Sequence, residues 1–244
     1  MNSFHIKGFT LVEVLLTSSI LLVFSGMAFQ FFISQHKEYE RSQQITEVQD
    51  RVRTVIDLLA LDIQSAGSRG VPIKQADPIV NPFTGTDGIN NADQFAVCYF
   101  DPYDTSNPAV LTNSSYGILN DPVTSVPTLY RQNVIRTANS NCKATPDVTD
   151  TTKRLPLASG IMAMNIRYLC NVLTDSSVPC ETLTPAQKSV SIRIKLLGRS
   201  LGFIRDYTDT NLNYSLAIKS GEAAQSITTV TGYYYYMLEK SITR

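Results

Sequence analysis

An acidic side chain, Glu13, stands near the start of the apolar stretch GFTLVEVLLTSSILLVF, residues 8–24. A carboxylate that faces lipid without a partner costs about 2–4 kcal/mol. The chemistry open to such a group is ion pairing, because a low dielectric makes the pairing of a buried charge both strong and selective. The sequence alone therefore indicates a costly charge that requires a partner.

Residue types that support catalysis are sparse. The two histidines are His5 and His36, and residues 37–244 contain none. Hydrolase, zinc-protease, phosphate-loop and dinucleotide-loop motifs do not occur. The segment DTNLN, which starts at Asp209, opens like a calcium loop but lacks the later glycine and glutamate, so a solvated turn is favoured. We expect no enzyme, no catalytic residue, no metal and no cofactor.

The four cysteines are Cys98, Cys142, Cys170 and Cys180, and no two of them form a CxxC pair, so their spacing argues against a zinc site. An even number of cysteines behind a membrane segment predicts disulfides. Of the three connectivities, sequential pairing of Cys98 with Cys142 and of Cys170 with Cys180 closes the shortest loops and is favoured. Buried free thiols are the alternative interpretation.

Composition sets broad limits on the class of protein. The 244 residues suffice for one or two domains with a core. Lys+Arg 21 balances Asp+Glu 21, so net charge gives no reason to expect a nucleic-acid partner. A charged fraction of 17%, with much of the polarity supplied by Ser, Thr, Asn and Tyr, favours a secreted β-rich domain.

A long helix must position Glu13. Charged residues are missing from Val14 to Gln35, a span of about 33 Å as helix and enough to cross a bilayer. Beyond it, apolar residues recur every three or four positions and form one stripe of an amphipathic helix. Proline does not interrupt residues 9–71, and glycines and a proline follow residue 66, so we predict one helix over 9–66. The stripe consists of Ile45, Val48, Val52, Val55, Ile56, Leu59, Ile63 and Ala66.

The basic head MNSFHIK, with Lys7, predicts a cytoplasmic N-terminus and an external remainder. A cleaved signal peptide is an alternative, since residues 26–28 would pass as a small-x-small cleavage site. Glu13 inside the apolar region and the unbroken helical pattern argue against it. Gly26 is either a point where the helix loosens on assembly or a close helix–helix contact.

After Pro72 the sequence predicts a β-rich domain. Loop-forming residues cluster in 72–93, 101–128 and 139–154. The run SVSIRIKLL alternates between apolar and polar residues, as a half-buried strand does. Strands joined by long loops behind one helix indicate an α+β fold in which an antiparallel sheet covers the apolar stripe. The expected strands are Gln94–Phe100, Thr128–Arg136, Ala163–Cys170, Ser189–Leu197 and Thr229–Leu238, the last with Tyr233–Tyr236 alternating between its faces and packing on the helix.

The segment from Gly8 to Glu13, GFTLVE, behind a short basic head resembles the class III signal of type IV pilins and pseudopilins. The resemblance implies a pilin-like fold, cleavage after Gly8 by a prepilin peptidase, N-methylation of Phe9, and Glu13 as the fifth mature residue. It also implies that, in a filament, Glu13 of one subunit pairs with the Phe9 amine of a neighbour. Such a pairing would supply the partner that the carboxylate requires.

Several segments resemble one subgroup, the PilW-like minor pilins. They are VIDLLALDIQSAGSRG, NADQFAVCYF, LASGIMAMNIRYLC and SVSIRIKLLGRS, whereas the tail TGYYYYMLEKSITR is more aromatic than that subgroup. The resemblance implies a minor pilin in a tip complex that primes pilus growth, with other minor pilins and the major pilin as partners. Two alternatives stay open: a J-type pseudopilin of a type II secretion system, and an anchored periplasmic binding module.

The resulting domain organisation has four parts. They are a leader (1–8), a transmembrane and filament-core helix half (9–36), an amphipathic helix half (37–70) and a periplasmic or extracellular β-rich head (71–244). The expected location is the inner membrane, crossed once with a cytoplasmic N-terminus, followed by the pilus tip and cell surface of a Gram-negative-type bacterium. The size of the head supports a minor role by analogy, because a subunit repeated thousands of times usually keeps its head small.

Overall fold

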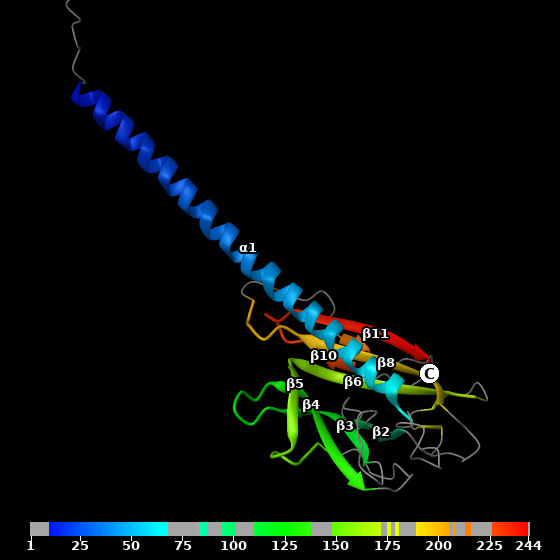
Figure 1. The fold of residues 1–244 in the computed structure, drawn as a ribbon. Coiled ribbons are helices and arrows are strands. Elements are labelled where there is room, and N and C mark those ends of the chain that lie inside the picture. The colour runs from blue at the N-terminus through cyan, green and yellow to red at the C-terminus, as the bar shows by residue number, and fades with distance from the viewer. Residues whose placement is uncertain are drawn as a thin grey trace, which may run out of the picture. The chain divides into compact units, whose positions relative to one another are not determined.

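The computed structural model contains one long helix and three antiparallel sheets (Figure 1). It describes residues 10–67, 83–86, 94–100, 110–137, 148–171, 175–176, 179–180, 189–204, 207, 213–215 and 226–243. The helix α1 comprises Leu11–Ser65, within two residues of the bounds that the apolar pattern predicts. Packing divides the chain into two units, Met1–Gln43 and Gln44–Arg244.

The larger sheet has five strands in the order β1-β2-β3-β4-β5, so each strand pairs with its neighbour in the sequence. Because consecutive strands pair antiparallel, the sheet is a meander. Asp121 stabilises the β3–β4 turn, where its side chain accepts hydrogen bonds from the backbone of Val123 and Thr124. The strands are β1 (Phe83–Thr86), β2 (Gln94–Phe100), β3 (Val110–Asn120), β4 (Pro127–Thr137) and β5 (Arg154–Ser159).

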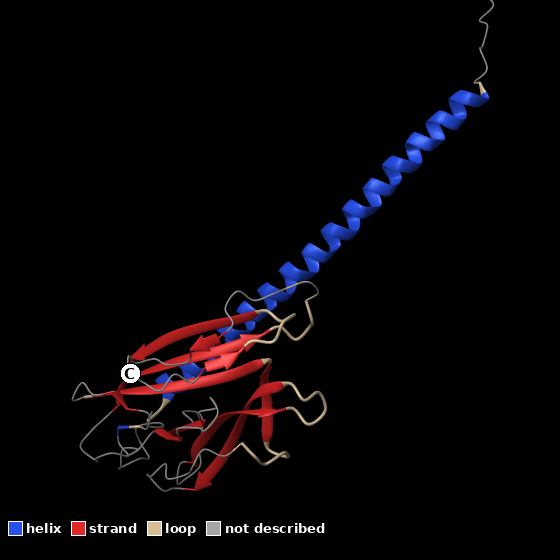
Figure 2. Ribbon diagram, turned by 180° about the vertical axis from the view of Figure 1, so that it is seen from behind, coloured by secondary structure: helices blue, strands red, loops and turns tan. Residues whose placement is uncertain are grey.

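The second sheet has four strands in the order β11-β8-β6-β7 and forms a separate layer of the head (Figure 2). A two-stranded sheet, β9 paired with β10, contributes Tyr214 and Ile227 to a small cluster on one face of this second sheet. The strands are β6 (Ile161–Cys170), β7 (Asp175–Ser176), β8 (Ser189–Arg199), β9 (Asn213–Ser215), β10 (Ser226–Thr228) and β11 (Tyr235–Thr243).

The main core joins the helix to both larger sheets. From Gln44 onward, α1 lies across the four-stranded sheet (Figure 1). Val52 lies so close to Gly198 of β8 that a side chain at position 198 would collide with it, which explains the glycine there. The predicted stripe is confirmed, because Val48, Val52, Val55, Ile56, Leu59, Ile63 and Ala66 are buried and Ile45 is half-buried.

Several strand predictions are confirmed, and others are wrong. β2 has the predicted bounds, and β4, β6 and β8 extend theirs by one or two residues. The predicted loop 101–128 contains β3, and the predicted loop 72–93 contains β1. The last strand begins at Tyr235 instead of Thr229, because residues 231–232 form a turn in which Gly232 has a φ of 87°. Within β8, Val190 is exposed at the strand's start, unlike the rest of its predicted face.

Candidate functional site

The start of α1 contains Glu13, the acidic residue of the apolar helix. Gly8 and Phe9 lie outside the described residues, so cleavage and methylation there stay predictions. Glu13 lies in the first turn of the helix and is exposed in the single chain. Among the described residues, its neighbours are those of the helix, with Thr10 immediately before the first turn.

Thr10 and Glu13 form a reciprocal cap at the helix start. The N–H and the hydroxyl of Thr10 each donate to Glu13 Oε2 at 3.2 Å. In return, the Glu13 N–H donates to Thr10 Oγ1 at 3.3 Å, and the Val14 N–H donates to the Thr10 carbonyl at 3.2 Å. This is a capping box, in which two amides without helical partners are satisfied by side chains three residues apart. Thr10 thus fixes where the helix begins and how the Glu13 carboxylate is oriented.

The cap changes the interpretation of Glu13. From the sequence, the carboxylate is expected to lack a local partner, and this expectation is wrong, because Thr10 supplies two donors to it. The spacing T-x-x-E before an apolar run is a known sequence signature of a helix start and would have revealed the cap. Both bonds end on Oε2, and since a carboxylate has about four acceptor positions, Oε1 retains capacity for a cation from another chain.

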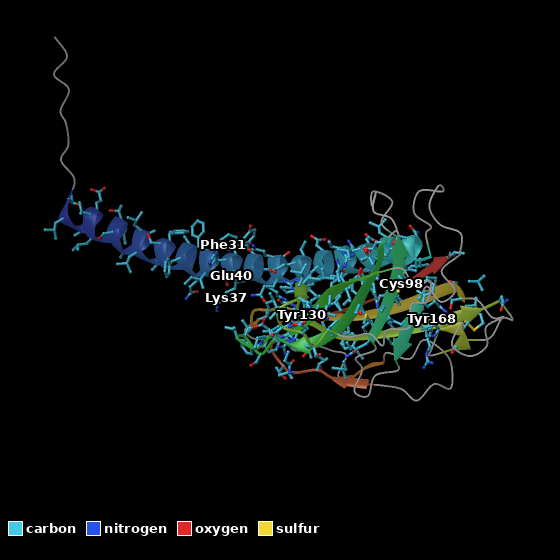
Figure 3. The ribbon with its side chains drawn as sticks, turned by 60° about the horizontal axis from the view of Figure 1, so that its bottom comes forward. Phe31, Lys37, Glu40, Cys98, Tyr130 and Tyr168 are labelled. Atoms are coloured by element: carbon cyan, nitrogen blue, oxygen red, sulfur yellow. A yellow bond between two sulfur atoms is a disulfide. The ribbon has the colours of Figure 1, made fainter. Side chains whose placement is uncertain are left out.

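The helix half that follows Glu13 is apolar and exposed on all sides. Figure 3 shows its side chains pointing outward, with Phe31 near the end of the apolar span and with Lys37 and Glu40 beyond it. The exposed apolar residues include Leu11, Val12, Val14, Leu15, Leu16, Ile20, Leu21, Leu22, Val23, Phe24, Met27, Phe29, Phe31, Phe32 and Ile33. In the described part of the chain, α1 is the helix that is long and apolar enough to cross a membrane.

Three hydroxyl groups near the start of this span are satisfied by the helix itself. The Thr17 hydroxyl donates to the carbonyl of Glu13 at 2.8 Å, and those of Ser18 and Ser19 donate to the carbonyls three residues earlier at 3.0 and 2.8 Å. A segment in hydrocarbon must satisfy its polar groups internally. The three hydroxyls are therefore compatible with lipid and with the apolar interior of a helical bundle. Gly26 is helical, and no described residue has an atom within 4 Å of the position that a Cβ would take there, which is compatible with both interpretations of this glycine.

An ion pair fastens the far end of the helix to the five-stranded sheet. Arg131 Nη2 of β4 lies 3.2 Å from Asp62 Oδ2, and both side chains are largely buried. The guanidinium also donates to Tyr99 Oη and Ser114 Oγ, each at 3.2 Å, and to Asn133 Oδ1 at 3.0 Å. Burial raises the pKa of Asp62, and the positive charge of Arg131 opposes that rise. A buried pair of this kind specifies position more than it adds stability.

A second contact fixes the helix against the turn between the two larger sheets. Arg51 donates through Nη1 to the Ser159 carbonyl at 3.1 Å and pairs with Glu47 one turn earlier. Gly160, whose φ is 80°, joins β5 to β6 at this point. The two contacts thus hold the head end of α1 at separate places along its length.

The cysteines form disulfides as far as the structure describes them. Cys170 is bonded to Cys180, with the two Cα atoms 5.6 Å apart, as predicted. Cys98 is also disulfide-bonded and fully buried. Cys142 lies outside the described residues, so the pairing of Cys98 with Cys142 stays a prediction.

The residues of the other candidate sites either pack against the core or lie outside the described residues. Among the described residues, no group of three or more His, Cys, Asp or Glu side chains could hold a metal ion. The calcium-like segment that starts at Asp209 lies outside them, apart from Asn213. The tyrosine run alternates as expected: Tyr234 and Tyr236 pack on the main core, and Tyr233 and Tyr235 pack on the opposite face.

Comparisons with known proteins agree with these features. Residues 4–29 match a family model described as the prokaryotic N-terminal methylation motif. The pilin-like protein PilA3 of Thermus thermophilus is 27% identical over 229 residues, which cover 93% of this chain and 87% of that protein. Type IV-like pilin TTHA1219 from Thermus thermophilus has a similar structure, with a TM-score of 0.51 at 13% identity over 80% of this chain and 94% of that one. The structural similarity confirms the expected pilin-like α+β fold.

Proposed function

We propose that this type IV pilin-like protein is a minor pilin. A prepilin peptidase cleaves it between Gly8 and Phe9, and Phe9 is then methylated. The mature subunit waits in the inner membrane and joins other minor pilins and the major pilin in a tip complex that primes pilus growth. Its final location is the pilus tip at the surface of a Gram-negative-type bacterium. The PilW-like segments support the PilW-like minor pilins as its subgroup.

The exposed apolar helix half carries the proposal. A side of a helix that faces water in a stable protein is polar, whereas this segment is apolar all round from Val14 to Ile33 and is exposed in the single chain. It therefore requires an apolar environment. A bilayer supplies one before assembly, and the helices of other subunits supply one afterwards.

The orientation of Glu13 supports a role in assembly. Thr10 holds Oε2 in place while Oε1 retains capacity for a donor from outside the chain. The new amine that cleavage creates on Phe9 of a neighbouring subunit is a cation of the right sign and size. An ion pair that forms only on assembly selects the register of neighbouring subunits, which is the best-attested use of a buried charge.

The number of copies per pilus tests the proposal. A tip subunit is present in a fixed number of copies however long the pilus grows, whereas a shaft subunit increases in proportion to length. Sheared pili would be separated by length, and the ratio of this chain to the major pilin would be measured by quantitative mass spectrometry. We expect the ratio to fall in inverse proportion to pilus length. A ratio that is independent of length, or absence of the chain from purified pili, would contradict the proposal.

A further inference from the structure

Four apolar or aromatic residues gather on two neighbouring loops of the head. They are Leu201 and Phe203, which follow β8, and Val230 and Tyr233, which precede β11. Leu201, Phe203 and Val230 are 45%, 62% and 56% exposed. We call these four residues the Phe203 patch. Exposed apolar residues that gather on one surface mark a contact with another molecule more often than isolated ones do.

Backbone hydrogen bonds hold the two loops of the Phe203 patch together. The Ser200 N–H donates to the Tyr234 carbonyl at 2.8 Å, and the Ile204 N–H donates to the Gly232 carbonyl at 2.7 Å. The Tyr234 N–H in turn donates to Ser200 Oγ at 3.1 Å. The patch is therefore built on a bonded framework, and its exposed side chains are presented at fixed positions.

Aromatic contacts add to this framework. The rings of Phe203 and Tyr233 meet edge to face, with centroids 5.9 Å apart. Phe203 also lies directly over Gly232, where any side chain would displace its ring. The Arg199 guanidinium stacks 4.7 Å from the centre of the Tyr233 ring. The exposed apolar side chains thus stand beside a phenol and a guanidinium, which are both polar groups on apolar stems.

The Phe203 patch lies beside the beginning of the head's part of the helix. Gly202, between Leu201 and Phe203, is so close to the Gln44 side chain that a Cβ at 202 would lie 2.6 Å from its amide nitrogen. Gln49 Nε2 donates to Tyr234 Oη at 3.2 Å. Both glutamines belong to the first turns of α1 within the unit Gln44–Arg244.

The chain between the apolar span and the Phe203 patch is short. Gln44 follows Gln35, the last residue before His36 and Lys37, by nine positions. These residues are helical and rise about 14 Å, and even a fully extended chain of that length would reach about 30 Å. The headgroup region on each side of a bilayer adds about 5–8 Å to the hydrocarbon core. When the span crosses a bilayer, the chain from Gln35 to Gln44 is therefore short enough for the patch to reach the headgroups.

We infer that the Phe203 patch rests on the outer headgroup region of the inner membrane while the subunit awaits assembly. This inference rests on the membrane-anchored state of the proposed function. A lipid interface fits the composition of the patch, because aromatic rings and basic side chains on apolar stems favour the boundary between hydrocarbon and water. The contact would hold the head against the membrane and would be released when the subunit leaves the bilayer for the pilus.

The chain contains no tryptophan, so a single introduced tryptophan reports on one position. Variants of the full chain would be reconstituted into phosphatidylcholine vesicles that carry no quencher, bromine on the acyl chains, or a nitroxide on the lipid headgroup. Bromine and nitroxide both quench tryptophan on contact. Phe203→Trp probes the patch, and Val230→Trp repeats that test if the first variant fails to fold. Phe24→Trp probes the apolar span. Thr243→Trp probes the exposed far end of β11, eight residues from Tyr235 and about 27 Å along the strand.

We expect brominated acyl chains to quench the tryptophan of Phe24→Trp, the headgroup nitroxide to quench that of Phe203→Trp, and neither quencher to change that of Thr243→Trp. If Phe24→Trp is quenched while Phe203→Trp and Val230→Trp are as bright as Thr243→Trp, the inference about the patch is wrong and the anchor stands. If the tryptophan at position 203 is shielded from water only in assembled pili, the patch contacts a neighbouring pilin, and the inference is likewise overturned. If Phe24→Trp itself is not quenched, the proposed membrane anchor is wrong and the inference falls with it.

Discussion

The Thr10 N–H donates to the Glu13 carboxylate at 3.2 Å in the first turn of α1, and the Glu13 N–H donates back to the Thr10 hydroxyl oxygen at 3.3 Å. The acidic residue of the apolar helix therefore has a local partner before any second subunit is present. The same bonds leave Oε1 with acceptor capacity, so the cap and a contact with a neighbouring subunit are compatible.

Thr10→Ala should loosen the start of the helix. Loss of the side-chain cap costs about 1 kcal/mol, which corresponds to about fivefold faster local opening. Hydrogen exchange of the Glu13 amide in the full chain, held in detergent micelles, measures that opening. Thr10→Ser keeps the hydroxyl and should exchange like the wild type. Equal exchange rates in Thr10→Ala and Thr10→Ser would show that the cap does not form in solution.

Variants of Glu13 separate the cap from the charge. Glu13→Gln keeps an acceptor for the Thr10 donors but removes the negative charge, whereas Glu13→Leu removes both. If the charge serves assembly, both variants should insert into the membrane and be cleaved like the wild type, yet be recruited poorly into the tip complex. Glu13→Asp should be intermediate, since it retains the charge with a shorter reach.

The measurement compares cleaved protein in the membrane with surface pili in the same cells. Loss of the protein itself in Glu13→Gln would show that the residue serves folding or insertion. Normal piliation with Glu13→Gln would show that hydrogen bonding to Thr10 suffices and that the charge has no role in assembly.

The buried pair Asp62–Arg131 predicts a defined pH dependence. Burial raises the pKa of Asp62 above its ordinary value of 3.8, against the opposing charge of Arg131. The folded chain therefore keeps a proton on Asp62 at pH values where the unfolded chain has lost it. The stability contributed in this way is fully present below pH 3.8 and is lost as pH rises through the folded pKa.

Asp62→Asn cannot titrate and lacks this step. The free energy of unfolding of the wild type, minus that of Asp62→Asn, should fall as pH rises from below 3.8 toward neutrality. Denaturant unfolding of both chains in micelles at a series of pH values measures the difference. A difference that stays constant or grows with pH would mean that Arg131 outweighs burial at this site.

Much of the fold could be predicted because its apolar residues are periodic. The stripe from Val48 to Ala66 gave the helix and its buried face, and the alternation in β8 gave a core strand. β3 could not be predicted in this way, because its middle residues Asn113, Ser114 and Ser115 are polar yet buried. Of these, Ser114 has a partner across the sheet, since its Oγ donates to Asn133 Oδ1 at 2.9 Å, and such a partner depends on tertiary structure.

The candidate site was predicted in part. The apolar helix and its acidic residue were evident from residue types, whereas the cap was missed although its two residues are only three apart. The Phe203 patch could not be predicted, since it combines two loops about 30 positions apart in the chain that only the pairing of β8 with β11 brings together.

Removal of the Cys170–Cys180 disulfide should destabilise the head and leave processing intact. With a sequence separation of 10 between the two cysteines, loop closure accounts for about 3 kcal/mol. The double variant Cys170→Ala/Cys180→Ala should unfold at lower denaturant concentration than the wild type, with the same cleaved N-terminus. An unchanged midpoint, or two free thiols at these positions in the wild type by alkylation and mass spectrometry, would contradict the bond.

The central claim is that the chain is processed and assembled as a pilin, and the mature N-terminus tests it most directly. Mass spectrometry of the protein from the membrane fraction should find Phe9 as the first residue, carrying one methyl group on its amine. Gly8→Val should leave the full-length precursor, since a side chain at position 8 would block the approach of the peptidase. A mature chain that begins at Asn2 or at Phe29, or normal cleavage of Gly8→Val, would contradict the account.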